Sequence, residues 1–236
     1  MTPITFAHRG GSADRPENSI AAFRSARERG ASGVESDVHL SADGVPVLIH
    51  EPVIRRGLRR SRVAALSFDT LSGLGLASLA ELYDAIGADL HVSLDLKVAD
   101  AGDPVIGVAR ERSALDRLWL CSPDLDLLRD LRARERRVRL VHSTTRRAIF
   151  DTMERHAATL AESEIDALNM HRTEWTRGLV ALFHRFHVRA FAWDAQEVRH
   201  LREVLRFGVD AVYCDDVDRM VGVVAEWTES AERPEF

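Results

Sequence analysis

The chain has 236 residues, of which 45% are hydrophobic and 29% charged, a composition ordinary for a soluble globular protein and a length that suits one α/β barrel. Its formal net charge of −5 at pH 7 is too small to indicate a nucleic-acid partner or a strongly anionic membrane surface. The two cysteines are too few for a disulfide framework, and the sequence shows neither a signal-peptide pattern nor a long apolar run. We therefore expect a cytoplasmic protein without stable membrane insertion, whose oligomeric state the composition does not predict.

The first elements alternate between short apolar strands and an amphipathic helix. Residues 4–8 are predicted to form a strand, and a helix follows with Asn18 as its expected N-cap. Residues 33–40 form the second predicted strand. The Asp43-Gly44 pair is typical of a tight hairpin turn, so residues 45–50 are expected to return antiparallel to that strand.

Six more units of strand followed by helix are predicted after this hairpin. The strands are expected at 89–97, 117–122, 137–143, 165–171, 188–194 and 209–215, and the helices at about 104–113, 124–136, 146–160, 176–186, 196–207 and 217–229. Alternating β and α elements imply a parallel sheet, and eight such units in this length predict a closed (β/α)8 TIM barrel. An open doubly wound sheet is the alternative, but no glycine-rich dinucleotide-binding motif follows the first strand.

Residues 51–77 interrupt this alternation. The segment holds five arginines, at positions 55, 56, 59, 60 and 62, ahead of an apolar stretch. We interpret it as a loop insertion over the carboxyl-terminal face of the barrel, within a single domain of residues 1–236. The arginines would then form a solvated surface or, alternatively, a site for an anionic lipid or a phosphorylated headgroup.

Acidic side chains and histidines gather at the predicted ends of the first strands, where TIM barrels have their active sites. Glu35 and Asp37 are two residues apart on one strand, so both side chains leave the same face. Two such carboxylates repel each other unless a cation lies between them. His8 and His50 flank this pair in the sequence. An oxygen-binding cation between two imidazoles is typical of metal-assisted phosphoryl or acyl transfer.

The third strand supplies further groups for the same face. Asp95 completes a set of three carboxylates that could hold Mg²⁺ or Ca²⁺ with positions left open for substrate oxygens. Lys97, two residues later, is the only lysine of the chain, which indicates a position that a planar guanidinium would not fit. Arg9 and Lys97 would together attract an anionic group such as phosphate. A purely structural ion pair between Asp95 and Lys97 is the alternative.

These residues carry a resemblance to a known family that spans nearly the whole chain. The motifs HRG and PENS, the Glu-Ser-Asp stretch, the Asp-Gly hairpin and the histidine after it resemble the glycerophosphodiester phosphodiesterase family. The likeness continues in SLAELYDAIG ahead of DLK, in AFAWDA and in GVDAVYCDD.

The resemblance implies a metal-dependent TIM-barrel enzyme that hydrolyses small glycerophosphodiesters to glycerol 3-phosphate and an alcohol. The metal ligands that it implies are the three carboxylates already named, Glu35, Asp37 and Asp95. His8 and His50 are implied as the general acid and base, in an order that the sequence leaves open. Arg9 and Lys97 are implied to hold the phosphate.

Other positions agree with the family pattern only in part. Trp193 lies near the family's tryptophan strand and is either a core residue or a wall against the glycerol or the headgroup. Glu51 stands where the family commonly has aspartate, and it would orient His50. Asp95 stands where the family has glutamate, which is longer by one C–C bond of about 1.5 Å. The arginines of the 51–77 segment replace a polar motif of Thr, Asn and Gly.

Two alternatives to this hydrolase remain open from the sequence. A lysophospholipase D-like or sphingomyelinase D-like enzyme would use the same chemistry on a lipid, and the apolar stretches 63–66 and 71–79 beside the arginines would favour it. A barrel that binds a phosphorylated ligand without catalysis is the other alternative, and the departures at Asp95 and Glu51 are its support.

Overall fold

Eight parallel strands close into a barrel in the computed structural model, which describes residues 2–56 and 59–232. The barrel strands are β1 (Ile4–Ala7), β2 (Gly33–Leu40), β7 (His91–Leu96), β8 (Leu118–Ser122), β9 (Arg139–Ser143), β10 (Ala167–His171), β11 (Arg189–Trp193) and β12 (Ala211–Cys214). The sheet closes because β1 pairs in parallel with both β12 and β2. The predicted TIM barrel is confirmed, and the open doubly wound sheet is wrong.

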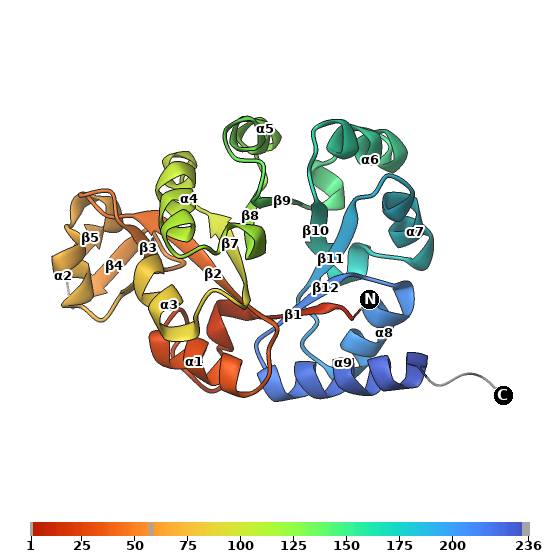
Figure 1. Ribbon diagram of the computed structural model, residues 1–236, viewed down its shortest axis with the longest axis horizontal. Helices are drawn as coiled ribbons and strands as arrows, with labels where there is room; N and C mark the ends of the chain where they lie inside the picture. Colours follow the sequence, from red (N-terminus) through yellow and green to blue (C-terminus); the bar gives the residue numbers. More distant parts are fainter. Residues whose placement is uncertain (1, 57–58, 233–236) are drawn as a thin grey trace.

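Helices surround these strands on the outside (Figure 1). They are α1 (Ile20–Glu28), α3 (Leu79–Ile86), α4 (Gly102–Glu111), α5 (Leu125–Arg134), α6 (Met153–Glu162), α7 (Arg177–Arg185), α8 (Val198–Phe207) and α9 (Val217–Glu232). Short 3-10 turns lie at η1 (His8–Gly10), η3 (Ala99–Ala101), η4 (Leu115–Arg117), η5 (Arg146–Ala148) and η6 (Arg172–Glu174). Among the described residues, no helix combines the length and the apolar character needed to cross a bilayer.

The observed boundaries differ from the predicted ones mainly at two helices. The helix expected from residue 146 begins at Met153, because Thr152 caps it by accepting a hydrogen bond from the backbone N–H of Arg155. The periodicity does not single out α3, although Ser78 and Glu81 form a capping box at its start. No helix is predicted from the sequence at this position, and the serine-to-glutamate spacing is the signal that could have predicted α3.

Two apolar clusters fill the fold. The larger one lies between the strands and the helices. The smaller one draws on β1, β8, β9, β10, β11 and β12 and fills the barrel interior with Phe6, Trp119, Cys121, Val141, Ala167, Phe191, Ala211 and Tyr213. The rings of Phe6 and Tyr213 stack there with centroids 4.8 Å apart. This inner cluster forms a packed floor beneath the carboxyl-terminal ends of the strands.

The segment 51–77 is not the irregular loop that its composition suggests. It contains the hairpin of β4 (Val53–Arg56) and β5 (Arg59–Arg62), the turn η2 (Val63–Ala65), the helix α2 (Phe68–Ser72) and the start of β6 (Ala77–Ser78), which pairs with β3 (Pro46–Leu48). Residues 57–58, within the predicted arginine loop, lie outside the described residues. The segment is ordered by its own small apolar cluster, built on Val47, Val63 and Leu71.

The turn after β1 requires residues with positive φ. Arg9, Gly10 and Gly11 have φ values of 50°, 84° and 89°. A Cβ added at Gly10 would lie 2.9 Å from Cβ of Ala22 on α1, so glycine is required there both by the backbone and by packing. Asn18, with φ of 55°, is not the N-cap of α1 as predicted, because Ser19 accepts the capping hydrogen bond instead.

Gly10→Ala is therefore expected to lower the free energy of unfolding by about 2–4 kcal/mol, because a left-handed backbone and a steric overlap both oppose the added methyl group. Gly44→Ala is the matched control, since Gly44 has φ of 79° with nothing within 4 Å of an added Cβ. Gly44→Ala should cost about 1 kcal/mol. Urea denaturation of both variants measures the difference, and equal losses would show that packing against α1 adds nothing.

Candidate functional site

A cavity of about 360 Å³ lies at the carboxyl-terminal ends of the barrel strands. Eight of the nine residues predicted for the site line it, from five different segments of the chain: His8, Arg9, Glu35, Asp37, His50, Asp95, Lys97 and Trp193. The ninth, Glu51, lies outside the cavity wall and contacts His50. The barrel thus brings together side chains that are up to 185 positions apart in the sequence (8 and 193).

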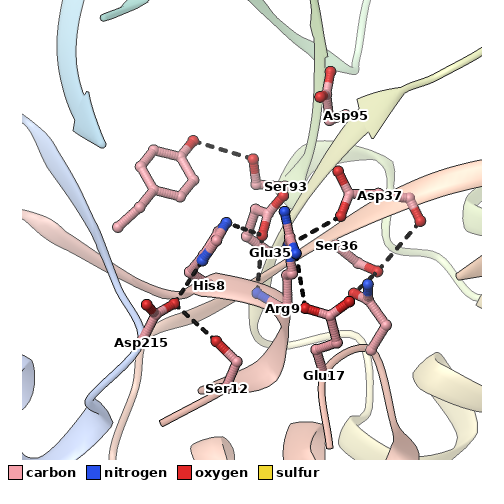
Figure 2. Close-up of polar contacts among 12 residues, drawn as sticks. His8, Arg9, Ser12, Glu17, Glu35, Ser36, Asp37, Ser93, Asp95 and Asp215 are labelled. Atoms are coloured by element: carbon pink, nitrogen blue, oxygen red, sulfur yellow. Dashed lines mark hydrogen bonds and ion pairs between the residues drawn. The ribbon is translucent and has the colours of Figure 1, made fainter. Parts of the chain in front are cut away.

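His8 lies between two carboxylates at the end of β1 (Figure 2). Its Nδ1 is 2.6 Å from Oδ1 of Asp215, and its Nε2 is 3.8 Å from Oε2 of Glu35. Burial acts to lower the pKa of His8, but the hydrogen bond to Asp215 and the charge of Glu35 outweigh it, so the pKa is raised overall. The same hydrogen bond lowers the pKa of Asp215. This environment favours a protonated imidazole whose Nε2 faces the cavity.

Glu35 is buried at the base of the site. Burial, together with the charges of Asp37 and Asp95, raises the pKa of Glu35 to about 7, while the charge of His8 acts in the opposite direction. Its Oε2 accepts a hydrogen bond of 2.9 Å from the backbone N–H of Arg9. The strained turn after β1 therefore supplies a donor to a carboxylate that would otherwise be buried with too little compensation.

The HRGG, PENS and Glu-Ser-Asp motifs interlock beside the cavity. The Arg9 guanidinium lies 2.7 Å from Oε2 of Glu17 and, through Nε, 3.4 Å from Oδ2 of Asp37. The backbone N–H of Asn18 donates to the carbonyl of Arg9, and Ser36 Oγ donates to Oδ1 of Asn18 at 2.7 Å. Ser36 alternates with Glu35 and Asp37 along β2, so this bond holds the strand from the side opposite the cavity.

Lys97 neutralises the carboxylates of two neighbouring strands. Asp37 of β2 and Asp95 of β7 are register partners, and the Nζ of Lys97 lies 2.8 Å from Asp37 Oδ1 and 2.5 Å from Asp95 Oδ2. Burial acts to lower the pKa of Lys97, but the charges and hydrogen bonds of these two carboxylates raise it overall. Lys97 therefore occupies a position that a metal cation could otherwise take between Asp37 and Asp95.

The donor set suits a hard cation, although the carboxylates are not gathered around one point. Among residues 2–56 and 59–232, no cluster of three or more His, Cys, Asp or Glu side chains is arranged to hold a metal ion. One carboxylate oxygen, Asp37 Oδ2, is nevertheless buried without a hydrogen-bond partner in this part of the chain. That oxygen lies 3.4 Å from Arg9 Nε, and the three carboxylates on adjoining strands offer the oxygen donors that Mg²⁺ or Ca²⁺ prefers.

His50 follows β3 and is held from two sides. Its Nδ1 is 2.9 Å from Oε1 of Glu51, and its backbone carbonyl lies 3.3 Å from Nε2 of His39. Its side chain is 35% exposed, so it lies at the mouth of the cavity rather than at its floor. Because an ionised carboxylate only accepts, Nδ1 donates to Glu51, and Nε2 is the ring nitrogen that this contact leaves available.

The part of the cavity wall that comes from β9, β10 and β11 carries fewer charged residues than the part from β1, β2 and β7. Trp193 at the end of β11 is 40% exposed, so it is a wall residue rather than a core residue. Its ring meets that of His171 edge-on at 4.6 Å. Asn169 donates to Ser143 Oγ at 3.2 Å, and both line the cavity.

The site predicted from the sequence does not include several residues that the structure places in or beside the cavity. Asp215, which holds His8, follows β12 and therefore stands at a strand end, which is the signal that could have assigned it. Ser12 also donates to Asp215 Oδ1, at 2.9 Å. Ser143 and Asn169 likewise stand at or near strand ends, whereas the other uncharged wall residues carry no comparable signal: Ser93, Cys121, Thr144, Thr145 and Tyr213.

Residues 8–97 match the model of a family described as the glycerophosphoryl diester phosphodiesterase family. The matched range contains every predicted site residue except Trp193.

Two curated proteins show the extent of the sequence likeness. Glycerophosphodiester phosphodiesterase 1 of Rattus norvegicus is 47% identical over 73 residues, which are 30% of this chain and only 22% of that protein. A glycerophosphodiester phosphodiesterase of Caldanaerobacter subterraneus is 25% identical over 248 residues, which cover 95% of this chain and 98% of that protein.

A solved structure shows the likeness in three dimensions. An Oleispira antarctica phosphodiesterase in complex with the product sn-glycerol-3-phosphate has a TM-score of 0.82 and 19% identity to this chain. The match covers 94% of this chain and 97% of that one. At this identity the likeness shows a common fold.

Asp215→Asn is expected to lower the pKa of His8, because the amide keeps the shape of the carboxylate and loses its charge. Since the pKa of His8 is raised above its ordinary value of 6.5, the protonated ring stabilises the folded state. That stabilisation is fully present below pH 6.5 and is lost as the pH rises through the folded-state pKa. The stability difference between wild type and variant should shrink in the same range.

NMR titration of the His8 ring and denaturation at several pH values measure both effects. Asp210→Asn is the matched control, since Asp210 pairs with an exposed histidine, His184, at 2.8 Å. It should leave the titration of His8 unchanged. An unaltered His8 titration in Asp215→Asn would contradict the assignment.

Proposed function

We propose that this chain, whose residues 8–97 match the glycerophosphoryl diester phosphodiesterase family, hydrolyses a small glycerophosphodiester to glycerol 3-phosphate and an alcohol. The observation that carries this proposal is the single cavity that holds both motif histidines with three carboxylates and two cations. The sn-glycerol-3-phosphate bound to the Oleispira phosphodiesterase supports the product class. We also propose that the protein is a single-domain cytoplasmic enzyme, with a place in glycerol and lipid metabolism.

His8 is the general acid of the first step in this proposal. Asp215 and Glu35 keep its ring protonated, and Asp215 holds Nδ1 so that Nε2 faces the cavity. When the bond between phosphorus and the alcohol oxygen breaks, that oxygen takes the proton from Nε2. His8 leaves this step neutral, with its Nδ1–H still bound to Asp215.

His50 is the general base of the same step. Its Nδ1–H donates to Glu51, which leaves Nε2 to take the proton from the glycerol hydroxyl that attacks phosphorus. The product is a cyclic phosphate of glycerol. In the second step His8 takes a proton from water as the water oxygen bonds to phosphorus, and His50 returns its proton to the glycerol oxygen that departs. Both histidines end in their starting states.

The remaining charged residues hold the phosphate and its developing charge. Arg9 and Lys97 line the cavity and place positive charge beside its carboxylates. Glu35, Asp37 and Asp95 would hold a divalent metal cation, Mg²⁺ or Ca²⁺. When bound, the cation would polarise a phosphate oxygen and neutralise charge in the transition state. Lys97 would then be released from Asp37 and Asp95 toward the phosphate.

The alternative of a lipid substrate is favoured in the sequence by the apolar stretches 63–66 and 71–79, but these stretches do not form an exposed apolar surface. The larger apolar residues of the described segment pack inward, since Ile54, Leu66, Phe68 and Leu76 contact the cluster of Val47, Val63 and Leu71, and Leu79 belongs to the main core. Among the described residues, the exposed large apolar side chains all lie elsewhere in the chain, at Val98, Phe150, Trp193 and Val198. A water-soluble diester therefore fits this surface better than a lysophospholipid or sphingomyelin.

His8→Ala and His50→Ala are expected to lower kcat by about 10²–10⁴-fold, because each removes one proton-transfer group. Release of glycerol 3-phosphate from glycerophosphocholine and glycerophosphoethanolamine with Mg²⁺ or Ca²⁺ measures the loss. His184→Ala removes a histidine outside the cavity and should retain wild-type turnover. If the wild type releases no glycerol 3-phosphate from either diester, the barrel is a binding protein and the proposal is rejected.

EDTA is expected to abolish turnover, and Asp95→Ala should weaken binding of Mn²⁺, used as a spectroscopic probe for the divalent site, by at least about tenfold. Electron paramagnetic resonance of the Mn²⁺ titration measures binding without relying on activity. Asp100→Ala is the control, since Asp100 is exposed and lies outside the cavity wall. Equal Mn²⁺ affinity in wild type and Asp95→Ala would exclude Asp95 as a ligand.

A further inference from the structure

One face of the β4–β5 hairpin gathers three arginines. Arg55 pairs in register with Arg60, and Val53 pairs with Arg62. Residues directly opposite in an antiparallel pair, and residues two positions along, point to the same face of the sheet. Arg55, Arg60 and Arg62 therefore share one face, which we call the arginine face.

The arginine face surrounds a hollow of about 740 Å³. Its lining residues are Glu51, Pro52, Val53, Arg55, Arg60 and Arg62. The three guanidinium groups make no ion pair with any acidic residue of the described chain. Many other arginines of the described chain form an ion pair with an acidic side chain, as Arg137 does with Asp116 at 2.6 Å. Like charges placed opposite each other across a strand pair repel, so a bound anion would relieve the repulsion among these three arginines.

The back of the hairpin is anchored to the barrel, which makes the arginine face a formed surface. Ile54 packs in the small cluster of Val63 and Leu71. Beyond the hairpin, the backbone N–H of Ala42 donates to the carbonyl of Leu66 at 2.8 Å. Figure 1 shows β4, β5 and α2 grouped together beside β3 at one edge of the molecule. Pro52 and Val53 are the apolar residues in the described lining of the hollow, and neither is a large exposed apolar side chain, so this face suits a soluble anion better than a bilayer.

The hollow adjoins the mouth of the catalytic cavity. His50 lines the cavity, Glu51 lines the hollow, and the two side chains are joined by a 2.9 Å contact. Their side chains are 35% and 70% exposed, so both stand at the rim. A cavity of about 360 Å³ has room for the glycerol and the scissile phosphate, so a larger alcohol group extends out of the mouth that His50 borders.

We propose that the arginine face binds a second anionic group, a phosphate carried by the alcohol part of the substrate. Three guanidinium groups on one face of a hairpin offer the forked donors whose hydrogen bonds phosphate oxygens accept. Glu51 also lines the hollow, but its Oε1 contacts His50, and among the described residues its carboxylate forms no ion pair with the three arginines. The inference rests on the proposed function and adds to it a substrate class, glycerophosphodiesters of phosphorylated polyols.

Two diesters that differ by one phosphate test this directly: glycerophosphoinositol and glycerophosphoinositol 4-phosphate. For the wild type, kcat/KM is expected to be about tenfold higher for the phosphorylated diester, mainly through a lower KM. The triple variant Arg55→Gln, Arg60→Gln, Arg62→Gln should lose this preference while it still hydrolyses glycerophosphoinositol. Equal kcat/KM for the two diesters in the wild type, or a preference that survives the triple variant, would overturn the proposal.

A matched control separates a local effect from a change in net charge. Arg24, Arg177 and Arg206 are exposed and make no ion pair within the described chain. Replacing these three with Gln removes the same charge far from the hollow and should keep the preference. If this control also loses the preference, the effect is one of overall charge, and the arginine face is not a site.

A measurement of equilibrium binding tests the arginine face without depending on the proposed hydrolase activity. Calorimetric titration of glycerophosphoinositol 4-phosphate into His8→Ala, with and without the three hairpin substitutions, should show tighter binding only when the arginines are present. If the wild type hydrolyses no glycerophosphodiester, the proposed function fails, and this titration alone still decides the inference. Binding that does not depend on the arginines would overturn it.

A membrane surface is the competing occupant of the arginine face. Sedimentation with phosphatidylcholine vesicles containing phosphatidylglycerol tests it with the same variants. We expect no arginine-dependent sedimentation. Arginine-dependent sedimentation without selectivity between the two soluble diesters would replace the proposed phosphate site with a membrane-facing one.

Discussion

The crowding of three carboxylates at the ends of β2 and β7 is the constraint on which the rest of the site depends. Glu35 and Asp37 are both buried, and Asp95 is the register partner of Asp37 on the next strand. Buried carboxylates destabilise a fold unless cations and donors compensate them. The compensation comes from the two flanking segments, as the turn after β1 brings Arg9 and His8 and the end of β7 brings Lys97. Each compensating group is also one that phosphodiester chemistry can use.

Closure of the barrel brings Asp215 to His8, the histidine that compensates Glu35. Asp215 reaches His8 because β12 pairs with β1, with Cys214 in register with Ala7. The bond joins the last strand to the first across 207 positions of sequence. An open sheet would leave His8 without this carboxylate and would leave its ring less basic. The acid–base state of the site thus depends on the same closure that gives the fold its stability.

The 51–77 segment combines an apolar cluster that packs against β3 with arginines that are exposed to solvent. Its apolar residues form a small cluster against β3, and that packing turns Arg55, Arg60 and Arg62 outward beside His50. The composition of the segment, rich in arginine and then in apolar residues, is compatible with a lipid-binding loop. The structure places Arg55, Arg60 and Arg62 on the hairpin face opposite Ile54, and no described residue of the segment is a large exposed apolar side chain of the kind a bilayer would need.

The sequence by itself determined the barrel and most of the site. Alternation of apolar runs and amphipathic segments is a local property, so it predicts the strands and helices, and the strand-end rule then places His8, Glu35 and Asp95 on one rim. Roles of the site residues stay proposals. What only the tertiary structure decided are contacts between distant segments: Asp215 on His8, Lys97 between two strands, and the register that gathers the arginines. Such contacts depend on closure, strand register and packing, which no local pattern encodes.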